Sequence, residues 1–529
     1  MYFYHMRYAI LFLTISSFIL HSQCSRKSAP DDNTAVVMED KSINGATPEE
    51  VEETVAKANE IPSDDSSGIP KEMMTSAEAN YVEYCGSCHG VKMEAFVDRK
   101  WKFGNTHEDL FKAIKYGYID EGMPAYEESF SDAEIDDLVN YIQEGLLTVD
   151  QYAFKKRMNH NGVFNTEKLQ IKLDTIATGL ERPWGITFLS EGNILIGDRN
   201  GKLYLYTPGG KKVEVENLPE IIEVGQGGLM DLETHPNYTE NGWIYFSYTK
   251  PSPSNSEEFT TAVMRAKLEL NRLIDKEEIF VALPYSSRKY HFGCRLEFDR
   301  DGYLFLTVGD RGNRDVNPQN LDNHCGKTHR IHDDGSIPKD NPFVNTEGAM
   351  PSIYTYGNRN AQGLAMNPID GKMWEHEHGP RGGDEINIIN KGINYGWPVI
   401  SYGINYNGTV FTEKTHQAGM EQPVMYWLPS IGVCGMTFVN SDKYPGWENN
   451  LLSGSLRFQY LEREVIENDE VVHQEKLFMG IGRLRVVETG PDGYIYVGVE
   501  EPGHVFRLLP IESDNKKIMN RKKKIKKKM

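Results

Sequence analysis

Cysteine, basic residues and long apolar runs are all scarce in this chain of 529 residues. Six cysteines are too few for a fold held together by disulfides at this length. The 57 lysines and arginines are outnumbered by 77 aspartates and glutamates, which gives a formal net charge of −20. Because an acidic surface repels phosphate backbones, we expect no nucleic-acid partner. Hydrophobic residues still make up 39% of the chain, so a wholly disordered protein is excluded.

The longest apolar run, residues 8–20, stands near the N-terminus after Arg7. It is too short to span a bilayer and is typical of an export signal. Cys24 follows the run where a bacterial lipoprotein carries its lipidated cysteine, but bulky Gln23 precedes it where a small residue is usual. Lipidation and ordinary cleavage are therefore both open. We expect an exported protein, periplasmic or anchored by lipid in a bacterial envelope, with no membrane-spanning helix in its mature part.

Composition and patterning predict a multidomain protein. The predicted parts are an export signal at residues 1–24, a disordered acidic linker at 25–75, a small all-α domain at 76–148, a second linker at 149–170, an all-β domain at 171–510 and a disordered basic tail at 511–529. A solvated tail is the favoured interpretation of the last part, and contact with anionic lipid or with the acidic linker is the alternative.

The all-α domain is predicted from apolar residues at helical spacing, and Ser131 with Glu134 forms a capping box that opens its last helix. A helical domain of this size usually needs a staple, such as a metal or a covalent group. The apolar positions are Leu110, Phe111, Ile114, Ile135, Leu138 and Ile142.

The all-β domain repeats one unit: a strand, a turn that contains glycine, and a second strand of alternating apolar residues. Repetition over some 340 residues favours a six-bladed β-propeller over a pair of β-sandwiches, which would not repeat the tight turn each time. Five copies begin at Ile186, Leu232, Leu296, Leu364 and Val487, and a weaker sixth copy begins at Gly435.

One short motif, Cys85-Gly-Ser-Cys88-His89, matches the attachment site of a c-type haem. Both thiols would form thioethers and His89 would be the proximal iron ligand, while a chance pattern or a redox thiol pair is the alternative. Met123, in Gly-Met-Pro-Ala-Tyr, can supply the second axial ligand. Residues 76–147 resemble a class I cytochrome c domain, so we expect haem c to be the staple.

The propeller carries a second set of motifs that closely resembles the glucose/sorbosone dehydrogenase family, nearer its aldose sugar dehydrogenases. The likeness runs from about residue 179 to 508 and implies a quinoprotein that uses pyrroloquinoline quinone (PQQ). The motifs are Gly225-Gln-Gly-Gly-Leu, Tyr290-His-Phe-Gly-Cys-Arg-Leu, Val308-Gly-Asp-Arg-Gly, Tyr356-Gly-Asn-Arg-Asn-Ala-Gln-Gly, Glu377-His-Gly-Pro-Arg-Gly-Gly-Asp-Glu-Ile-Asn, Gly392-Ile-Asn-Tyr-Gly-Trp-Pro and Gly482-Arg-Leu-Arg.

The resemblance implies which residues hold the cofactor. PQQ has three carboxylates, and planar guanidinium groups suit carboxylates. Arg457 stands where the family usually has lysine, which keeps the charge but alters the geometry. An isolated arginine is more often a solvated surface charge. The implied residues are Arg359, Arg457, Arg483 and Arg485 for the carboxylates, Gln226 and Asn360 for the quinone oxygens, and Trp427 over the ring face.

Calcium is implied next. Main-chain carbonyls at Gly379 and Pro380 match the family's cofactor-linked calcium, and Glu385 with Tyr395 matches a second, structural site. The nearby sequence His376-Glu377-His378 invites a transition-metal site as the alternative, although no third ligand is evident.

His291 matches the general base of the family, and Asp310 can hold its ring as in catalytic triads. A structural histidine at a blade edge is the alternative. Tyr290 replaces an acidic sugar-binding residue of the soluble glucose dehydrogenases, and Asp315 replaces a glutamine, so glucose itself is not implied. Cys294, Cys325 and Cys434 fall in motif loops; as an odd set they leave a free thiol unless Cys24 pairs, and buried inert thiols are the default interpretation.

We therefore expect a PQQ-dependent enzyme that oxidises the C1 hydroxyl of an aldose and passes electrons to its own haem and then to an external acceptor, a cytochrome or an oxidase. Two alternatives stay open. One is a calcium-dependent propeller that hydrolyses sugar lactones, which needs neither haem nor an arginine cluster. The other is a non-catalytic propeller that serves as a platform for an electron-carrier cytochrome.

Overall fold

The computed structural model describes residues 75–89, 93, 101, 103–119, 123–148, 160–500 and 502–511. The predicted export signal, Cys24 and the basic tail beyond Ile511 lie outside the described residues, as do all of the acidic linker but Thr75 and residues 149–159 of the second linker. No helix among the described residues is long and apolar enough to cross a membrane. Export and lipidation stay predictions.

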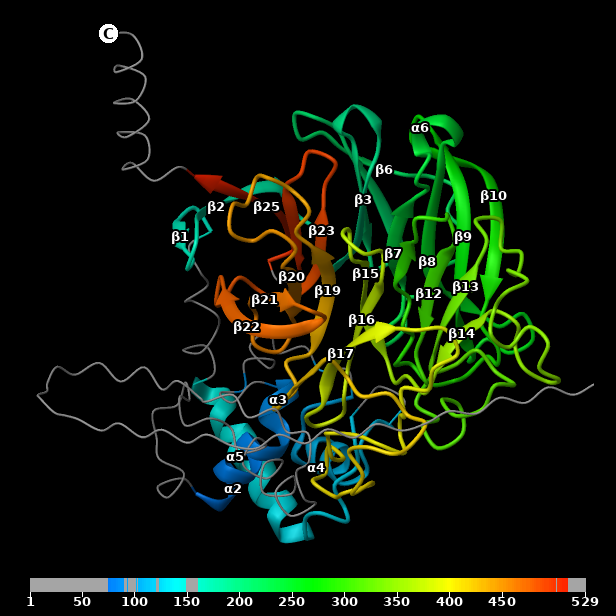
Figure 1. The fold of residues 1–529 in the computed structure, drawn as a ribbon. Coiled ribbons are helices and arrows are strands. Elements are labelled where there is room, and N and C mark those ends of the chain that lie inside the picture. Colours follow the sequence, from blue (N-terminus) through cyan, green and yellow to red (C-terminus); the bar gives the residue numbers. More distant parts are fainter. Residues whose placement is uncertain are drawn as a thin grey trace, which may run out of the picture. The chain divides into compact units, whose positions relative to one another are not determined.

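The N-terminal described part is all-α, as predicted (Figure 1). Its first helix runs without a break through α2 (Ser76–Asn80), a π-helical turn η2 (Tyr81–Cys85) and α3 (Gly86–His89). The other helices are α4 (His107–Tyr116) and α5 (Asp132–Thr148).

Capping and packing fix these helices. The predicted capping box is confirmed: the main-chain N of Ser131 donates to Oε2 of Glu134 at 2.8 Å, and N of Glu134 donates to Oγ of Ser131 at 3.4 Å. A second box, Thr106 with Asp109, opens α4. Of the predicted apolar positions only Phe111 is not fully buried; the core comprises Tyr81, Met93, Leu110, Ile114, Tyr126, Phe130, Ile135, Leu138, Val139 and Ile142.

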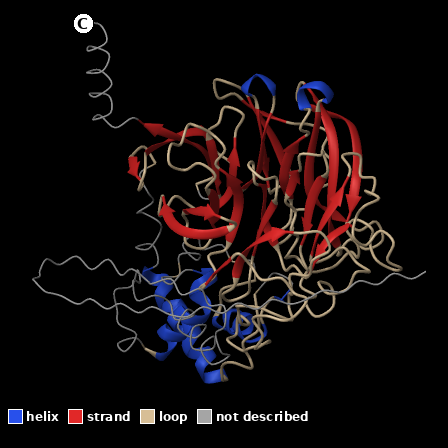
Figure 2. Cartoon of the chain, viewed as in Figure 1, coloured by secondary structure: helices blue, strands red, loops and turns tan. Residues whose placement is uncertain are grey.

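The C-terminal described part is a β-propeller of six antiparallel sheets, which confirms the predicted fold. Figure 2 shows it as strands and loops, with helix only in short turns, η6 (Ser190–Gly192) and α6 (Tyr238–Asn241). All six predicted hairpins are present as the first two strands of a blade, for example with Ile186 opposite Ile196 and Val487 opposite Val497.

The strands of the first three blades are as follows. Blade one has β3 (Pro183–Phe188), β4 (Ile194–Asp198), β5 (Lys202–Tyr206) and β6 (Lys212–Glu214); blade two has β7 (Leu229–Thr234), β8 (Trp243–Pro251), β9 (Phe259–Glu269) and β10 (Arg272–Val281); blade three has β11 (Leu296–Phe298), β12 (Leu304–Val308), β13 (Lys327–Ile331) and β14 (Ile353–Tyr356).

The other three blades complete the ring. Blade four has β15 (Ala361–Met366), β16 (Met373–Glu377), β17 (Asp384–Ile389) and β18 (Met425–Trp427); blade five has β19 (Val433–Phe438), β20 (Leu451–Ser455), β21 (Leu461–Glu467) and β22 (Glu470–Leu477); blade six has β23 (Leu484–Thr489), β24 (Ile495–Val499) and β25 (His504–Ile511), extended by β2 (Gln170–Ala177) and β1 (Val163–Asn165).

Blade six closes the propeller with strands from both ends of the domain. β2 precedes blade one in the chain but pairs with β25, from Gln170 opposite Ile511 to Ala177 opposite Val505. Because β2 pairs with β25 as the fourth strand of the last sheet, β25 presents no open edge there. The hairpin repeat alone did not predict this closure, since β2 lacks the repeated unit.

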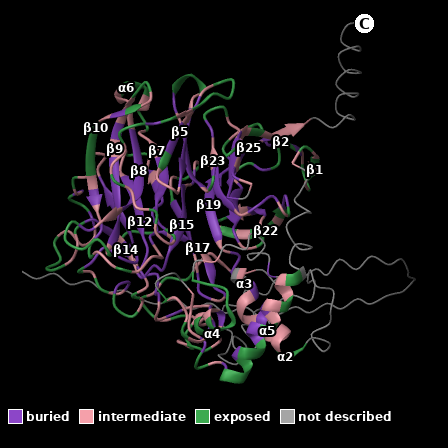
Figure 3. Ribbon diagram, turned by 180° about the vertical axis from the view of Figure 1, so that it is seen from behind, coloured by how far each residue is buried: buried purple, intermediate pink, exposed green. Residues whose placement is uncertain are grey.

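Apolar clusters fill each junction between neighbouring blades. Figure 3 shows the buried residues concentrated on the strands. Six separate clusters pack blade one on two, two on three, and so on around to six on one; Trp374 and Phe438, for example, join blades four and five. Each blade is therefore held by its two neighbours, which keeps the loops at the ends of the strands in fixed positions.

Candidate active site

The predicted site residues gather where the innermost strand of a blade begins and its second strand ends. In an antiparallel hairpin these two points lie at the same edge, opposite the turn. His291 and Arg359 precede innermost strands, whereas Asp310, His378 and Arg457 follow second strands. We call this edge of the propeller the site rim. The glycine turns recognised in the repeat lie at the other edge.

His291 and Asp310 form the pair that the sequence predicted. Nδ1 of His291 lies 2.7 Å from Oδ1 of Asp310. The same oxygen accepts N of Gly312 at 2.7 Å, while Oδ2 accepts Nε1 of Trp397 at 2.9 Å. Asp310 is buried, and three donors hold its carboxylate in one orientation. An ionised carboxylate beside Nδ1 keeps the ring proton there, which leaves Nε2 as the basic nitrogen.

The charges around this pair keep His291 neutral and Asp310 ionised. Burial lowers the pKa of His291, and Arg359 lowers it further, against the opposing effect of Asp310. Burial alone would raise the pKa of Asp310, but His291, Arg359 and the Gly312 amide together bring it below its ordinary value. A neutral imidazole at pH 7 can accept a proton.

The backbone at His291 is held in an unusual conformation. Its φ is 57°, in the left-handed region that residues other than glycine rarely adopt. Oε1 of Gln226 accepts N of His291 at 2.9 Å, so blade two fixes the residue that blade three carries. Gln226, predicted to bind the quinone, thus uses its oxygen to position His291 and retains only its amide group for a ligand.

A cavity of about 830 Å³ lies at the site rim. Four arginines line it against two glutamates, which leaves an excess of positive charge. Nε of Arg199, buried in this wall, has no hydrogen-bond partner. Size, charge and the unsatisfied donor fit a polycarboxylate such as PQQ. The lining side chains that matter here are Arg182, Arg199, Arg483, Arg485, Glu181, Glu500 and Gln226.

Arg483 and Arg485 occupy the wall in different ways. Arg485 is buried, and its guanidinium contacts Oε1 of Glu500 at 2.5 Å, Oε1 of Gln362 at 3.2 Å and Sγ of Cys434 at 3.3 Å. Arg483 donates to Oε2 of Glu500 at 3.0 Å and keeps 41% of its side chain exposed. Although burial opposes it, the two arginines lower the pKa of Glu500 far below its ordinary value. Arg483 is therefore the one of the two with donors left for a ligand.

The remaining predicted cofactor residues lie at the site rim except one. Arg359 is buried, donates to O of His378 at 3.0 Å and has an unpartnered Nε. Oδ1 of Asn360 accepts N of Gly293 at 3.1 Å. Arg457 donates to O of Ser430 at 2.9 Å. Trp427 instead packs between blades four and five, where its indole donates to Glu462 at 2.8 Å. Of the predicted quinone-binding residues only Gln226, Arg483 and Arg485 line the cavity itself; Arg359, Asn360, Arg457 and Trp427 do not.

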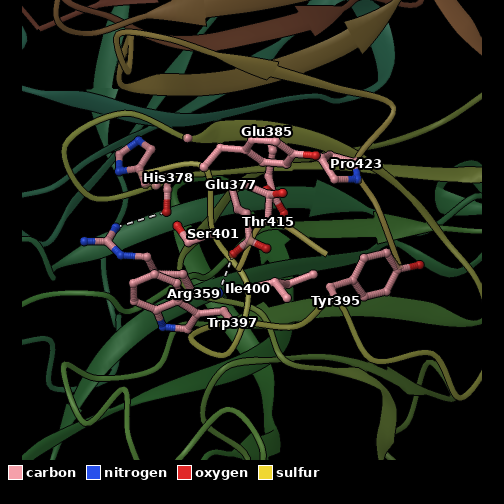
Figure 4. Close-up of a pocket in the computed structure, with 13 residues that line it drawn as sticks. Arg359, Glu377, His378, Glu385, Tyr395, Trp397, Ile400, Ser401, Thr415 and Pro423 are labelled. Carbon is pink, nitrogen blue, oxygen red and sulfur yellow. Dashed lines mark hydrogen bonds between the residues drawn. The ribbon is translucent and has the colours of Figure 1, made fainter. Parts of the chain in front are cut away.

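A second, small cavity of about 20 Å³ lies where β16 ends and β17 begins, lined mainly by loop residues (Figure 4). Glu377 and Glu385 line it, and burial raises the pKa of both carboxyl groups, to about 7 and about 8. Carboxylate oxygens around a space of ionic size suit a hard cation. Tyr395 also lines it, but its hydroxyl donates to O of Ile388 and accepts from N of Asn390, pointing away from Glu377 in Figure 4. Only the main-chain carbonyl of Tyr395 therefore remains as a ligand for a cation.

Asp384 fixes the loop that carries Gly379 and Pro380. Its Oδ1 accepts N of Gly379 at 2.9 Å, and its Oδ2 accepts the amides of Gly432 and Val433 at 2.6 and 3.2 Å. The loop of blade four is thereby tied to the start of blade five. Carbonyl groups in a loop held this firmly are suitable calcium ligands.

The transition-metal alternative receives no support. Nε2 of His376 contacts O of Gly435 and Nε2 of His378 contacts O of Val433, so both rings bind main-chain carbonyls. In the part of the chain that the structure describes, no group of three or more His, Cys, Asp or Glu side chains is arranged around a common metal position. A calcium site here would depend on carbonyl oxygens and on atoms of the cofactor.

The haem motif ends the first helix of the all-α part. Cys85 and Met123 both pack against its apolar core, and burial lowers the pKa of His89, which favours the neutral, ligating ring. The side chain of Cys88 lies outside the described residues. A cysteine that can form a thioether to haem, an imidazole and a methionine sulfur in one small domain suit a haem iron with His and Met ligands.

Comparison with known proteins identifies both parts. Residues 180–507 match the family model described as Glucose / Sorbosone dehydrogenase. The chain belongs to this family. Residues 72–142 match the model described as Cytochrome C oxidase, cbb3-type, subunit III, and the all-α part is a cytochrome c domain.

Relatives within the glucose/sorbosone dehydrogenase family cover the propeller. Aldose sugar dehydrogenase YliI of Escherichia coli (strain K12) is 40% identical over 352 residues, covering 65% of this chain and 93% of that protein. Quinoprotein glucose dehydrogenase B of Acinetobacter calcoaceticus is 29% identical, covering 62% and 85%. The crystal structure of the soluble Escherichia coli aldose sugar dehydrogenase in its apo form gives a TM-score of 0.62 at 38% identity, covering 64% of this chain and 100% of that one.

Four charged residues of the arginine-lined cavity escaped the sequence interpretation: Glu181, Arg182, Arg199 and Glu500. Arg182 precedes the innermost strand of blade one, and Arg199 and Glu500 follow the second strands of blades one and six. These are the positions that carry His291, Asp310 and Arg359 in other blades. Aligning the six repeats by strand end would have found them.

Proposed function

We propose that the propeller oxidises the C1 hydroxyl of an aldose with a bound quinone of the PQQ type, and that the cytochrome c domain receives the electrons. The observation that carries the proposal is the His291–Asp310 pair on the same rim as the arginine-lined cavity. The names of the relatives support the sugar and the quinone.

His291 acts as the general base. Nε2 accepts the proton of the substrate hydroxyl as the hydrogen on the same carbon leaves as hydride. Asp310 holds the ring through Nδ1 and stabilises the imidazolium that forms. When bound, the quinone would supply the two-electron acceptor for the hydride, and the haem would supply a one-electron carrier toward an external cytochrome or oxidase.

The cavity wall binds and orients the cofactor. Arg483 and Arg199 have free donor capacity for carboxylates, and Arg485 keeps Glu500 and the floor of the cavity in place. The carbonyls of Gly379 and Pro380 would hold calcium, which would supply Lewis-acid polarisation of the acceptor, and Glu385 with the Tyr395 carbonyl would hold a second calcium.

The sugar enters beside Tyr290. The ring of Tyr290 meets the His291 ring edge-on, with centroids 4.8 Å apart, and the Tyr290 hydroxyl accepts a hydrogen bond from Arg288 at 2.8 Å. Asp315 is mostly exposed and pairs with Arg314 at 3.4 Å. An aromatic ring next to the base can pack against the apolar face of a pyranose. It cannot bind sugar hydroxyls through a charged carboxylate, as an acidic residue at this position would.

The test is reduction of an artificial dye by purified protein with a panel of aldoses. Activity is expected only after PQQ and calcium are added together. Lactone hydrolysis without dye reduction would favour the hydrolase alternative, and no turnover of either kind, with PQQ binding absent, would favour the non-catalytic platform.

A further inference from the structure

Lys327 is a fully buried lysine in the first position of β13. Burial lowers its pKa, while nearby Asp322 and Asp310 raise it and so favour the ammonium form. Its ammonium forms no ion pair among the described residues. It donates instead to three oxygens: O of Cys325 at 2.6 Å, O of Asn317 at 2.7 Å and Oδ1 of Asn323 at 3.3 Å. Burying a lysine this way is costly, so its position calls for a reason.

The three oxygens belong to the segment between β12 and β13, residues 309–326, which forms turns and bends but no helix or strand. Asn317 lies in its middle and Cys325 near its end. Nδ2 of Asn323 also donates to O of Asn317 at 3.3 Å. The ammonium thus draws together the middle and the end of the segment, much as a bound cation organises a loop through carbonyl oxygens.

Asp310 is the second residue of the same segment. Nδ2 of Asn317 donates to the main-chain O of Asp310 at 2.9 Å. A continuous path therefore runs from the Lys327 ammonium through Asn317 to Asp310, and from the Asp310 carboxylate to His291 at 2.7 Å. Lys327 itself touches neither the cavity nor His291.

We propose that Lys327 is a positioning residue for the reaction: its ammonium serves as a built-in cation that fixes residues 310–326 so that Asp310 presents its carboxylate to Nδ1 of His291. The inference rests on the proposed role of His291 as base. It explains why a lysine that forms no ion pair within the described part of the chain occupies the interior of blade three.

The first test is Lys327→Ala with chemical rescue. With PQQ and calcium bound, kcat is expected to fall about 10- to 100-fold, because a displacement of the base by about 1 Å is enough for such a loss. KM and the affinity for PQQ, measured by fluorescence quenching, stay within about twofold. Ammonium or methylammonium restores part of kcat by filling the vacated space, whereas tetramethylammonium does not. Lys250→Ala, which removes a lysine paired with Glu278 in blade two, is the matched control and keeps wild-type kcat.

Asn317→Ala is the second variant, and it decides the case if Lys327→Ala does not fold. It keeps the carbonyl that binds Lys327 but removes the amide that binds Asp310. We expect a similar loss of kcat that ammonium does not restore. Wild-type kcat in either variant overturns the proposal, and so does a loss in Lys327→Ala that no small ammonium ion relieves while Asn317→Ala is normal.

A readout without turnover separates this inference from the proposed function. The Nδ1 proton that His291 shares with Asp310 is expected as a downfield proton NMR resonance in the cofactor-free protein, assigned by its loss in His291→Gln. It shifts or broadens in Lys327→Ala and Asn317→Ala but not in Lys250→Ala. An unchanged resonance in both variants removes the role of Lys327. A wild-type protein that shows the resonance but oxidises no sugar removes the proposed function alone.

Discussion

At the scale of single residues, the direction of proton transfer depends on which ring nitrogen of His291 carries the proton. The carboxylate of Asp310 accepts a hydrogen bond from Nδ1 of His291 and is itself held by donors from Gly312 and Trp397. The imidazole ring therefore cannot turn Nε2 inward without breaking its bond to Asp310. The left-handed backbone at His291, fixed by Gln226, is the local strain that such a placement requires.

Changing His291 to Gln is the direct test of the base. Turnover is expected to fall on the order of 10²–10⁴-fold, the usual contribution of a general base, while PQQ affinity is retained. Titration of the cofactor, followed by single-turnover reduction with sugar, measures the two effects separately. Near-normal reduction in this variant would remove His291 from the mechanism.

The pH dependence follows from the lowered pKa of His291. Only the neutral ring accepts a proton, so kcat/KM falls as the pH drops through this pKa. Because burial and Arg359 lower it, the acid limb is expected below about pH 6.5, the ordinary value for histidine. Arg359→Met, measured at saturating cofactor, moves the limb to higher pH. A limb at or above pH 6.5 in the wild type contradicts the assignment.

The three propeller cysteines are free and buried, as the default interpretation held. Burial raises the pKa of Cys325 to about 11 and that of Cys294 far above its ordinary value. A thiol reagent at neutral pH is therefore expected to label none of Cys294, Cys325 and Cys434 in the folded protein and all three in guanidinium chloride. Peptide mass spectrometry reads out each site, and rapid labelling of any of them under native conditions would show an opening that the structure does not contain.

At the scale of elements, the blades were predictable because each hairpin carries its own signal. Leu296 to Thr307 reads as strand, Asp-Gly turn and strand whatever surrounds it, and the structure pairs Leu296 with Leu306 as that reading requires. The capping box at Ser131 is equally local. Interactions within a few residues of one another leave their pattern in the sequence.

What escaped prediction depends on contacts between blades. Arg199 and Glu500 meet the cavity only because blades one and six are neighbours in the closed ring, and β2 shows no sign of pairing with β25. Trp427 has an aromatic side chain that could cover the quinone ring, but it packs in the junction of blades four and five. The His291–Asp310 pair could be predicted because the family resemblance assigned roles to both residues, although they lie on two different loops of blade three.

Helix α5 offers a test of the cytochrome c domain as an element. Ser131→Ala removes Oγ, which accepts N of Glu134, while the main-chain N of residue 131 keeps its bond to Glu134; the change should cost about 1 kcal/mol in the unfolding free energy. Guanidinium denaturation of the full chain, followed by haem absorbance, reports on this domain. Asn140→Ala, an exposed position within α5, is the control and should not lower stability. Equal stability of the wild type and Ser131→Ala would mean that the cap contributes nothing.

At the scale of the whole molecule, one chain contains a site for a two-electron oxidation and a domain for a one-electron carrier. The proposed quinone site belongs to the propeller rim and the haem motif to the all-α part. When two redox centres share a chain, each meets the other at an effective concentration set by the linker, not by the amount of protein in solution. Under the proposed function, fusion makes haem reduction independent of collisions between molecules.

The measurement that tests the account most directly is rapid mixing of the haem- and PQQ-loaded protein with an aldose, followed by haem absorbance. The haem should become reduced only when PQQ and calcium are present, and at a rate that does not change over a tenfold range of protein concentration. His291→Gln should abolish the signal, and Lys250→Ala should keep it. A haem that stays oxidised while an added dye is reduced, or a rate that rises in proportion to protein concentration, would contradict transfer from the quinone to the haem of the same chain.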